Sequence, residues 1–455
     1  MSILGLTNDE QATVSRLLKQ LSDRRVRNEL RRAYMDCKKV PVPPPTVPPY
    51  LRQIQMVLGW PAKAVEALAR RVRLTGFAIP GSELSTFGLD EVLDENDYVS
   101  ESRMAQMSAM EHGVSWLVAT RGGAGEPDVL VTRQSALDGT GDWNIRARRL
   151  TTFLSVTARD SNGAPAAFNL YAPGSVAMVD KGGLVDRVAT GLDHVPVEPL
   201  VYRQRDGRPF GSSRISRPLM KITDSAVRTM LRSEGTADFY GVPLLALFGP
   251  DESFFDNNSP LKMLLSSMFA IPDNPDANSD ANERAKLQQL TQASQQPHVD
   301  QLQFWAQLFA GEAHIPVTSL GIGMLQANPT NADAYTASRE DLISEAEDAA
   351  DGFTRAHVRT LQTSWLLRSG EAKLPAELRT LQPTWRDPRH ESKAAQADWL
   401  TKVASVVPWI ADTDTVLDLL GLPEGTADQL RGEHKQALAR QTMQALMAQP
   451  DAAQT

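Results

Sequence analysis

Histidine, cysteine and carboxylate side chains carry much of the chemistry in proteins, and in this sequence they are scattered. Cys37 is the only cysteine, and one thiol cannot build a thiolate zinc site. Adjacent acids such as Glu347 and Asp348 do not share a helix face, so they do not form an acid–base pair. Each histidine stands alone and is typical of a core or surface residue rather than a ligand or base: His112, His194, His298, His314, His357, His390 and His434.

Motifs that hold cofactors are missing as well. The chain has no GxxxxGK[ST] loop, whose glycines, lysine and hydroxyl would hold nucleotide phosphates and magnesium. Gly321-Ile322-Gly323 lacks the third glycine and the preceding strand of a dinucleotide fingerprint. HExxH, GxSxG and CxxC do not occur. We therefore expect no cofactor, no metal and no enzymatic activity.

Length and composition indicate a large globular protein. A chain of 455 residues is longer than the length that a single hydrophobic core usually supports, so two or more sub-domains are expected. No apolar stretch is long enough to span a membrane, and the first residues do not resemble a signal peptide. We expect folding in a reducing cytoplasm, without disulfides. The net charge of −8 disfavours tight DNA binding but suits a surface past which DNA slides.

Charge is distributed unevenly along the chain. Residues 11–75 contain 14 Lys and Arg against four Asp and Glu, a local excess of 14 − 4 = 10 positive charges. This basic band is either a solvated helix face or a contact with acidic capsid, scaffold or packaged DNA. Residues 333–359 contain seven acids against three arginines, which is typical of a solvated acidic helix face.

Hydrophobic periodicity predicts helices joined by a β region. Apolar residues at helical spacing predict helices over residues 8–34, 61–75, 102–113, 222–242, 297–311, 338–368, 412–421 and 426–447. The first should be capped by Asn8 or Asp9, and the fourth by Thr223 or Asp224. Strand-like runs at 114–120, 128–133, 151–158, 166–172 and 200–204 predict a mainly antiparallel β region. The fold class is therefore α+β.

Three stretches are predicted to be irregular. Residues 40–50 are so rich in proline that an extended polyproline-II strap is expected. Residues 242–296 contain many turn-forming and polar residues, and 272–284 should be mobile. Residues 321–335 combine glycines with Asn-Pro and small polar residues, which indicates an exposed loop.

The order of several motifs resembles that of the portal proteins of long-tailed bacteriophages, particularly those of actinobacterial hosts. The matching segments are RRAYMDCKKV followed by Leu58–Phe77, then Glu101–Ala119, Gly207–Pro243, Gly321–Phe353 and the WRDP of Trp385–Pro388. Cys37 and its neighbours replace the aromatic-Gly pattern usual in the first motif. Five motifs in the family's order, spread over almost the whole length, make the resemblance specific.

The resemblance implies a portal-type fold with a helical stem and crown and an α/β wing, assembling into a ring, usually of twelve subunits. On this reading the parts are a wing (1–221 and 313–385), stem helices (222–241 and 297–312), a clip (242–296), a tunnel loop (321–333) and a crown (386–455). The stem would present Asp224, Arg228, Arg232, Asp300 and Gln303. The tunnel loop would present Gln326, Asn328, Thr330, Asn331 and Asp333 to DNA.

Such a ring occupies one capsid vertex of the virion, is assembled in the host cytoplasm, and carries DNA during packaging and ejection. The implied partners are further copies of the chain, the terminase large subunit, a head–tail adaptor, major capsid and scaffold proteins, and double-stranded DNA contacted without sequence preference. No membrane is implied. Two alternatives remain open: a minor capsid or structural head protein without a DNA channel, and an enzyme of unknown type.

Overall fold

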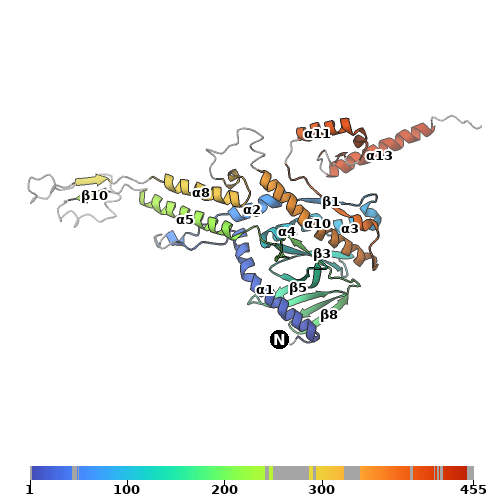
Figure 1. The fold of residues 1–455 in the computed structure, drawn as a ribbon, viewed down its shortest axis with the longest axis horizontal. Helices are drawn as coiled ribbons and strands as arrows, with labels where there is room; N and C mark the ends of the chain where they lie inside the picture. The colour runs from blue at the N-terminus through green and yellow to red at the C-terminus, as the bar shows by residue number, and fades with distance from the viewer. Residues whose placement is uncertain are drawn as a thin grey trace, which may run out of the picture. The chain divides into compact units, whose positions relative to one another are not determined.

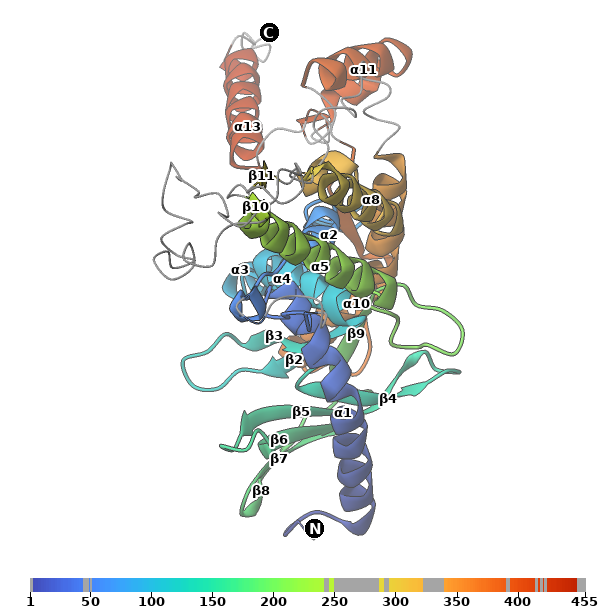
Figure 2. The ribbon, with the colours of Figure 1, turned by 90° about the vertical axis from the view of Figure 1, so that its left-hand side faces the viewer.

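A computed structural model gives the fold (Figures 1 and 2). It describes residues 3–43, 49, 51–240, 245–248, 286–289, 294–321, 339–389, 393–413, 416–417, 420 and 424–447. The chain divides into two compact units, Met1–Pro388 and Arg389–Thr455. Helices and mainly antiparallel strands make up the first unit, which confirms the predicted α+β class.

Long helices frame the first unit. They are α1 (Asn8–Met35), α2 (Trp60–Ala69), α3 (Leu89–Glu95), α4 (Tyr98–His112), α5 (Arg217–Tyr240), α8 (Gln296–Glu312) and α10 (Glu340–Ser369). Short 3₁₀ turns lie at Leu51–Gln53, Leu84–Phe87, Val317–Leu320 and Glu377–Thr380. The predicted amphipathic faces of α1 and α10 are confirmed: Val14, Leu17 and Leu21 are buried in one, and Phe353, Leu361 and Trp365 in the other.

Antiparallel strands form the sheets of this unit. A three-stranded sheet has the order β3-β2-β9, from Val129–Ser135, Val114–Arg121 and Val197–Val201. A five-stranded meander runs through β4 (Gly139–Asn144), β5 (Arg149–Arg159), β6 (Pro165–Ala172), β7 (Ser175–Asp180) and β8 (Gly183–Ala189). Two pairs complete the set: β1 (Leu74–Ala78) with β12 (Gln382–Trp385), and β10 (Leu245–Phe248) with β11 (Lys286–Gln289).

These elements stack in four layers. Leu117 and Ala119 of β2 face the helical core of α4 and α10, whereas Trp116 and Val118 face the five-stranded sheet. The other face of that sheet, including Leu154, is covered by apolar residues of α1, and Figure 2 shows α1 running alongside these strands. Because β2 lies between two layers, nearly all its residues are buried, which explains its unbroken apolar run.

Both predicted helix caps are wrong, and α4 begins at Tyr98 rather than at residue 102. In α1 the cap is Thr7, whose hydroxyl accepts from the Glu10 amide while the Glu10 carboxylate accepts from the Thr7 amide, so Asn8 and Asp9 lie inside the helix. In α5 the helix starts at Arg217, several residues before Asp224. Pro218 suits the first turn of a helix because its missing N–H is not needed there.

Gly113 fixes the corner between α4 and β2. Its φ of 103° is a left-handed conformation, and a Cβ atom there would lie 3.1 Å from the backbone of Ser212. Only glycine fits this close crossing of two backbone segments. The predicted helix end at Gly113 is thereby confirmed. Cys37, just beyond α1, is exposed and also has a positive φ, of 56°.

The second unit is described over α11 (Lys393–Val406), a 3₁₀ turn at Pro408–Asp412 and α13 (Glu424–Met447). Its apolar side chains are largely exposed: Trp409 is 69% and Trp399 46% accessible. Across the described chain, no helix is both long and apolar enough to cross a bilayer.

Several predicted segments lie wholly or partly outside the described residues. They are most of the proline-rich strap, the clip apart from β10 and β11, the loop after Gly321, and part of the helix predicted at 412–421.

Candidate functional site: the α5–α8 helix pair and the buried arginine at its base

Helices α5 and α8 pack against each other, and Figure 1 shows them extending together away from the sheets. The described part of the connection between them includes the β10–β11 pair. Polar contacts join the helices along their length: Thr229 to Gln301 at 3.3 Å, Ser233 to Gln295 at 3.2 Å and Thr236 to His298 at 3.1 Å. These uncharged contacts fix how the two helices face each other.

Apolar packing holds the base of the pair. The Phe309 ring of α8 is fully buried and lies 5.4 Å from the Trp60 ring of α2, measured between centroids. Burying a side chain of this size stabilises a fold by about 1.5–3 kcal/mol. Ala226 of α5 and Ala306 and Ala310 of α8 belong to the same apolar cluster as these two rings. The pair is therefore anchored to the first unit at this end.

The five predicted stem residues have different surroundings. Asp224 is not free, because it accepts a hydrogen bond of 2.7 Å from the hydroxyl of Tyr34 in α1. Arg228 is half-buried and donates to Ser225 of the same helix. The remaining three do not point to a shared site: Arg232 is exposed on α5, Asp300 is exposed on α8, and Gln303 is half-buried. The predicted tunnel-loop residues, from Gln326 to Asp333, lie outside the described residues.

Arg214, just before α5, ties several elements together. Its side chain is 2% exposed and donates to the carbonyls of Ala64 in α2, at 2.7 Å, and Ala313 after α8, at 2.6 Å. The same guanidinium forms an ion pair with Glu345 of α10 and donates to the hydroxyl of Tyr202 at 3.2 Å. One buried cation thus joins the base of the helix pair to α10.

Glu345 carries the negative charge of this cluster. Tyr202 donates to its carboxylate, and Arg203 lies 2.7 Å from it. Burial alone would raise the pKa of Glu345, but the Arg214 guanidinium outweighs burial and holds that pKa below its ordinary value. The expectation of a fully solvated acidic face on this helix is therefore wrong at Glu345, whereas Asp348 is exposed as expected.

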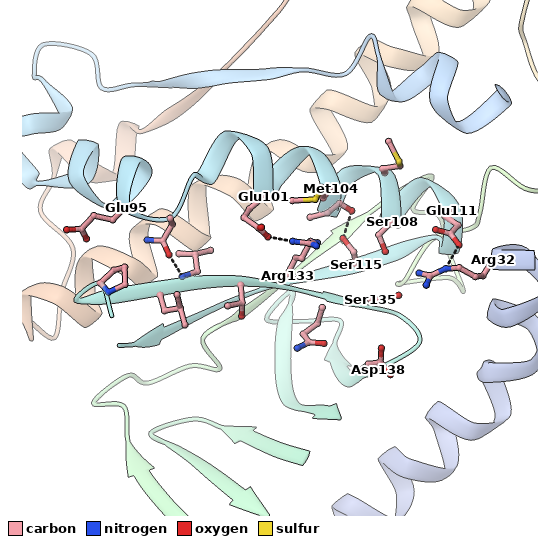
Figure 3. A pocket seen from close by; sticks show the side chains of 18 residues that line it. Arg32, Glu95, Glu101, Met104, Ser108, Glu111, Ser115, Arg133, Ser135 and Asp138 are labelled. Atoms are coloured by element: carbon pink, nitrogen blue, oxygen red, sulfur yellow. Dashed lines mark hydrogen bonds and ion pairs between the residues drawn. The ribbon is translucent and has the colours of Figure 1, made fainter. Parts of the chain in front are cut away.

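A groove of about 770 Å³ lies between α4 and the edge strand β3 (Figure 3). Arg133 pairs with Glu101 across it, and Arg32 pairs with Glu111 at 3.1 Å. The Ser108 hydroxyl lines the groove and is buried without a hydrogen-bond partner. The ion pairs hold these four charged groups in place, so they neutralise one another within the groove wall.

Histidines within the described chain behave as structural residues where they are buried. His357 is completely buried, and its ring nitrogens lie 3.1 Å from the Tyr98 hydroxyl and 3.1 Å from the Gln106 amide nitrogen. Burial lowers the pKa of His357 to about 3, so the ring is neutral at pH 7. Among the described residues, no group of three His, Cys, Asp or Glu could hold a metal ion.

The structure is a layered α+β fold with a packed helix pair, and comparisons with known proteins identify the family. The family model for phage portal proteins of the SPP1 Gp6-like type matches residues 12–420. The chain therefore belongs to the phage portal protein family. Members of this family are structural components of phage virions. The resemblance drawn from the motifs is confirmed.

Individual relatives agree with the family match. The chain is 25% identical over 381 residues to the portal protein of Mycobacterium phage L5, covering 79% of this chain and 74% of that protein. It is 25% identical over 370 residues to the portal protein of Mycobacterium phage D29, with the same coverage of each chain. Both relatives come from phages of actinobacteria.

Solved structures were also compared. A chain in the neck of an empty GTA particle, computed with C6 symmetry, has a TM-score of 0.45 and 14% identity, covering 80% of this chain and 90% of that chain. A chain in the neck of a native GTA particle, computed with C12 symmetry, has a TM-score of 0.43 and 12% identity, covering 86% of this chain and 98% of that chain.

The buried cluster around Arg214 was not found from sequence. Arg214 stands in a stretch, GSSRIS, without helical or strand periodicity, and Tyr202 and Glu345 are far from it along the chain. No feature of the local sequence predicts that Arg214 is buried, because most arginines in proteins are exposed. Glu345 gives no local signal either, because the residues one turn away from it on the helix include the acids Asp341 and Asp348.

Proposed function

We propose that this chain assembles into a ring at one vertex of a phage capsid and forms the channel through which DNA enters and leaves. The observation that carries the proposal is the portal family match over residues 12–420. In this ring α5 and α8 are the stem helices, residues 242–296 the clip, 386–455 the crown, and the layered remainder the wing. Residues 321–333 form the tunnel loop. The role is structural, without catalysis.

Assembly requires a surface that contacts neighbouring copies, and α8 offers one. Phe304 is 51% and Leu308 43% exposed, and these residues are four apart, so they share a helix face. That face lies away from the buried face of Ala306 and Phe309. Apolar side chains left exposed on a helix are typical of a contact between proteins. In the ring this face packs against the adjacent subunit.

The proposed partners follow from the position of the ring. During packaging it docks the terminase large subunit, and afterwards the head–tail adaptor, while the wing contacts major capsid and scaffold proteins. Copies of this chain form the rest of the ring, which we expect to contain twelve subunits. The channel contacts double-stranded DNA without reading its sequence.

Electron microscopy of the purified chain tests this proposal directly. We expect closed rings with a central channel and a particle mass near twelve times the 49.9 kDa subunit mass. Recombinant rings can close with another subunit number, so the image of a channel decides rather than the mass. Shell-like assemblies or a stable monomer would favour the alternative of a head protein without a channel.

The tunnel loop gives a functional test of the same proposal. Replacing Gln326, Asn328 and Asn331 by Ala removes neutral polar groups that we expect to make weak contacts with the DNA backbone. Rings should still form, but the amount of DNA packaged or retained should change. Measuring packaged genome length in particles built with the variant checks this. An unchanged length would show that these residues only shape the loop.

A further inference from the structure

The basic band of the N-terminal region divides into two groups of arginines on α1. One group is paired with acids: Arg16 with Asp142, Arg25 with Glu29 at 2.6 Å, and Arg32 with Glu111 at 3.1 Å. The other group forms no ion pair within the described part of the chain: Arg24, Arg27 and Arg31. These three are spaced by three and four residues, so they lie along one side of the helix.

The unpaired arginines line a cavity of about 310 Å³. The cavity lies between α1, strands β2 and β4, and the loop of residues 207–212. Arg208 of that loop adds a fourth guanidinium, and Phe210 of the same loop packs its ring 5.5 Å from the Arg24 guanidinium carbon. Neither Asp nor Glu occurs among the described residues that line the cavity. Four cations therefore converge on one recess without a counter-ion.

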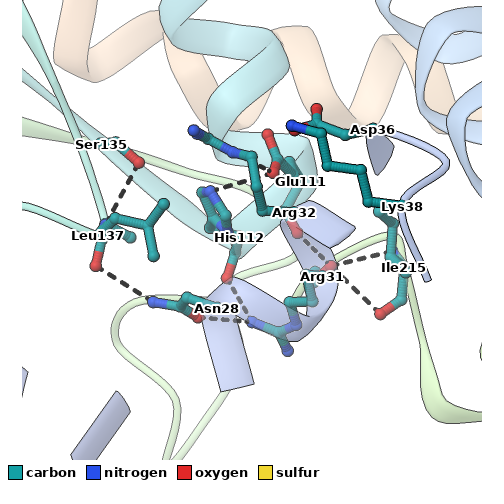
Figure 4. A network of polar contacts seen from close by, with 12 residues as sticks. Asn28, Arg31, Arg32, Asp36, Lys38, Glu111, His112, Ser135, Leu137 and Ile215 are labelled. Atoms are coloured by element: carbon teal, nitrogen blue, oxygen red, sulfur yellow. Dashed lines mark hydrogen bonds and ion pairs between the residues drawn. The ribbon is translucent and has the colours of Figure 1, made fainter. Parts of the chain in front are cut away.

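Two residues that line the cavity, Arg31 and His112, carry buried polar atoms without a hydrogen-bond partner, and Figure 4 shows how these two residues lie. His112 is 4% exposed and lines the cavity, and its Nδ1 atom has no hydrogen-bond partner. The Nε of Arg31 is also buried without a partner, although its Nη1 donates to the His112 carbonyl at 2.7 Å. Buried polar atoms are nearly always paired, so these two are able to bind a polar group that enters the cavity.

Burial and mutual repulsion lower the pKa values of Arg24 and Arg31. Burial, and next the charge of Arg27, lower the pKa of Arg24. Burial lowers the pKa of Arg31 to about 10, with further contributions from Arg27 and Arg208. Both groups remain protonated at pH 7. Asp142 and Glu111 offset this repulsion only in part, because Asp142 is also held by Arg16 and Thr152, and Glu111 by Arg32.

We propose that this cavity binds the carboxylate of an acidic segment of another protein, with Arg27, Arg31 and Arg208 donating to its oxygens. Guanidinium groups suit this role because their planar N–H pairs match the two oxygens of a carboxylate. Phe210 and Trp116, which line the same cavity, would contact the apolar part of the entering side chain. This inference does not depend on the ring or the channel.

The geometry favours an acidic peptide over DNA. A duplex presents a row of phosphates, and its binding sites spread Lys and Arg along a stripe. Here the arginines converge on a single small recess, which receives one protruding anionic group. The net charge of −8 on the whole chain also repels a long polyanion more strongly than a short peptide.

Fluorescence anisotropy on the purified full-length chain tests the proposal, with labelled hexaglutamate as the probe and hexaglutamine as the neutral control. Arg27→Gln and Arg208→Gln remove exposed arginines that form no ion pair, so the fold should be retained. Each should weaken hexaglutamate binding about tenfold, the effect of losing one charged hydrogen bond. Each should also raise the melting temperature without peptide, because one repulsive charge is gone.

A matched control is Arg103→Gln, which removes the same charge from an exposed position on α4. It should leave peptide affinity unchanged within twofold. An equal loss in this control would show general charge attraction and overturn the proposal. Tighter binding of a short DNA duplex, with the same dependence on Arg27 and Arg208, would reassign the cavity to nucleic acid. Binding of inorganic phosphate but not of hexaglutamate would reduce it to a small-anion site.

Discussion

Arg214 and Glu345 place a charged pair in the interior of the protein, where an unpaired charge is far less stable than a paired one. The guanidinium also donates to the carbonyl of Ala64 within α2 and to the carbonyl of Ala313, which caps the C-terminal end of α8. This single side chain therefore connects α2, the base of the α5–α8 pair and α10. These contacts explain how a charged side chain is accommodated in the interior of the protein.

Replacing Glu345 by Gln should destabilise the chain by about 3 kcal/mol, because Arg214 is then buried without a counter-ion. Urea unfolding of the variant and the parent protein measures this difference. The control Asp348→Asn, at an exposed position of the same helix, should change the free energy of unfolding by less than about 0.5 kcal/mol. Equal effects of the two changes would show that the ion pair contributes nothing specific.

His357 should make stability depend on pH. Its pKa is about 3 in the folded chain and near 6.5 when unfolded, so the unfolded state takes up a proton first as pH falls. The neutral ring contributes full stability above about pH 6.5, and this contribution is lost progressively as pH falls towards 3. His357→Gln should therefore show a smaller decrease in melting temperature between pH 7 and pH 5 than the parent chain.

His434→Gln is the control for this experiment, because His434 is exposed on α13. It should reproduce the parent's pH dependence. His112, whose pKa burial lowers to about 3, keeps part of the pH dependence in every variant. If His357→Gln keeps the parent chain's full dependence of melting temperature on pH, this dependence does not come from His357.

At the level of elements, the exposed face of α8 leads to a prediction about assembly. Replacing both Phe304 and Leu308 by Gln should shift the particle population from rings towards smaller species, because the proposed subunit contact loses its apolar side chains. Folding should be retained, since neither side chain is buried. Mass photometry and circular dichroism measure the two properties. Gln307→Ala, at an exposed position between them, should leave rings intact.

The helices could be predicted largely from sequence because their apolar residues repeat regularly. The helix predicted over 338–368 corresponds to α10 (Glu340–Ser369), and the strand predicted at 114–120 corresponds to β2 (Val114–Arg121). Seven strands were missed, none of them longer than seven residues: β1, β4, β7, β8, β10, β11 and β12. In strand β8, for example, five of the seven residues are exposed. Their pairing depends on partners distant in sequence.

The candidate sites were harder to predict for a related reason. Periodicity identifies which helix face is buried, but it does not show which polar residues are brought together from distant segments. Arg31 and Arg208 approach one cavity although 177 residues separate them, and only the fold reveals it. Helix starts were also misplaced by a few residues, because Thr7 and its partner Glu10 were one of several local capping choices.

At the scale of the whole molecule, the division after Pro388 predicts that the first unit folds alone. The buried apolar residues of the first unit form three clusters. None of these clusters includes a residue beyond Trp385, so none needs the second unit. A chain ending at residue 388 should keep its cooperative melting transition within a few degrees. Differential scanning calorimetry of the shortened and complete chains tests this. Loss of the transition would show that the second unit contributes to the first unit's core.

The exposed thiol just after α1 has a practical consequence for counting and tracking subunits. Because Cys37 is the only cysteine, a maleimide dye attaches at one chemically defined position per chain without any engineered residue. In a closed assembly the dyes would lie at symmetry-equivalent points, so energy transfer between identical dyes would depend on the number of labelled neighbours. Depolarisation as a function of labelling fraction would then report both stoichiometry and subunit exchange in solution.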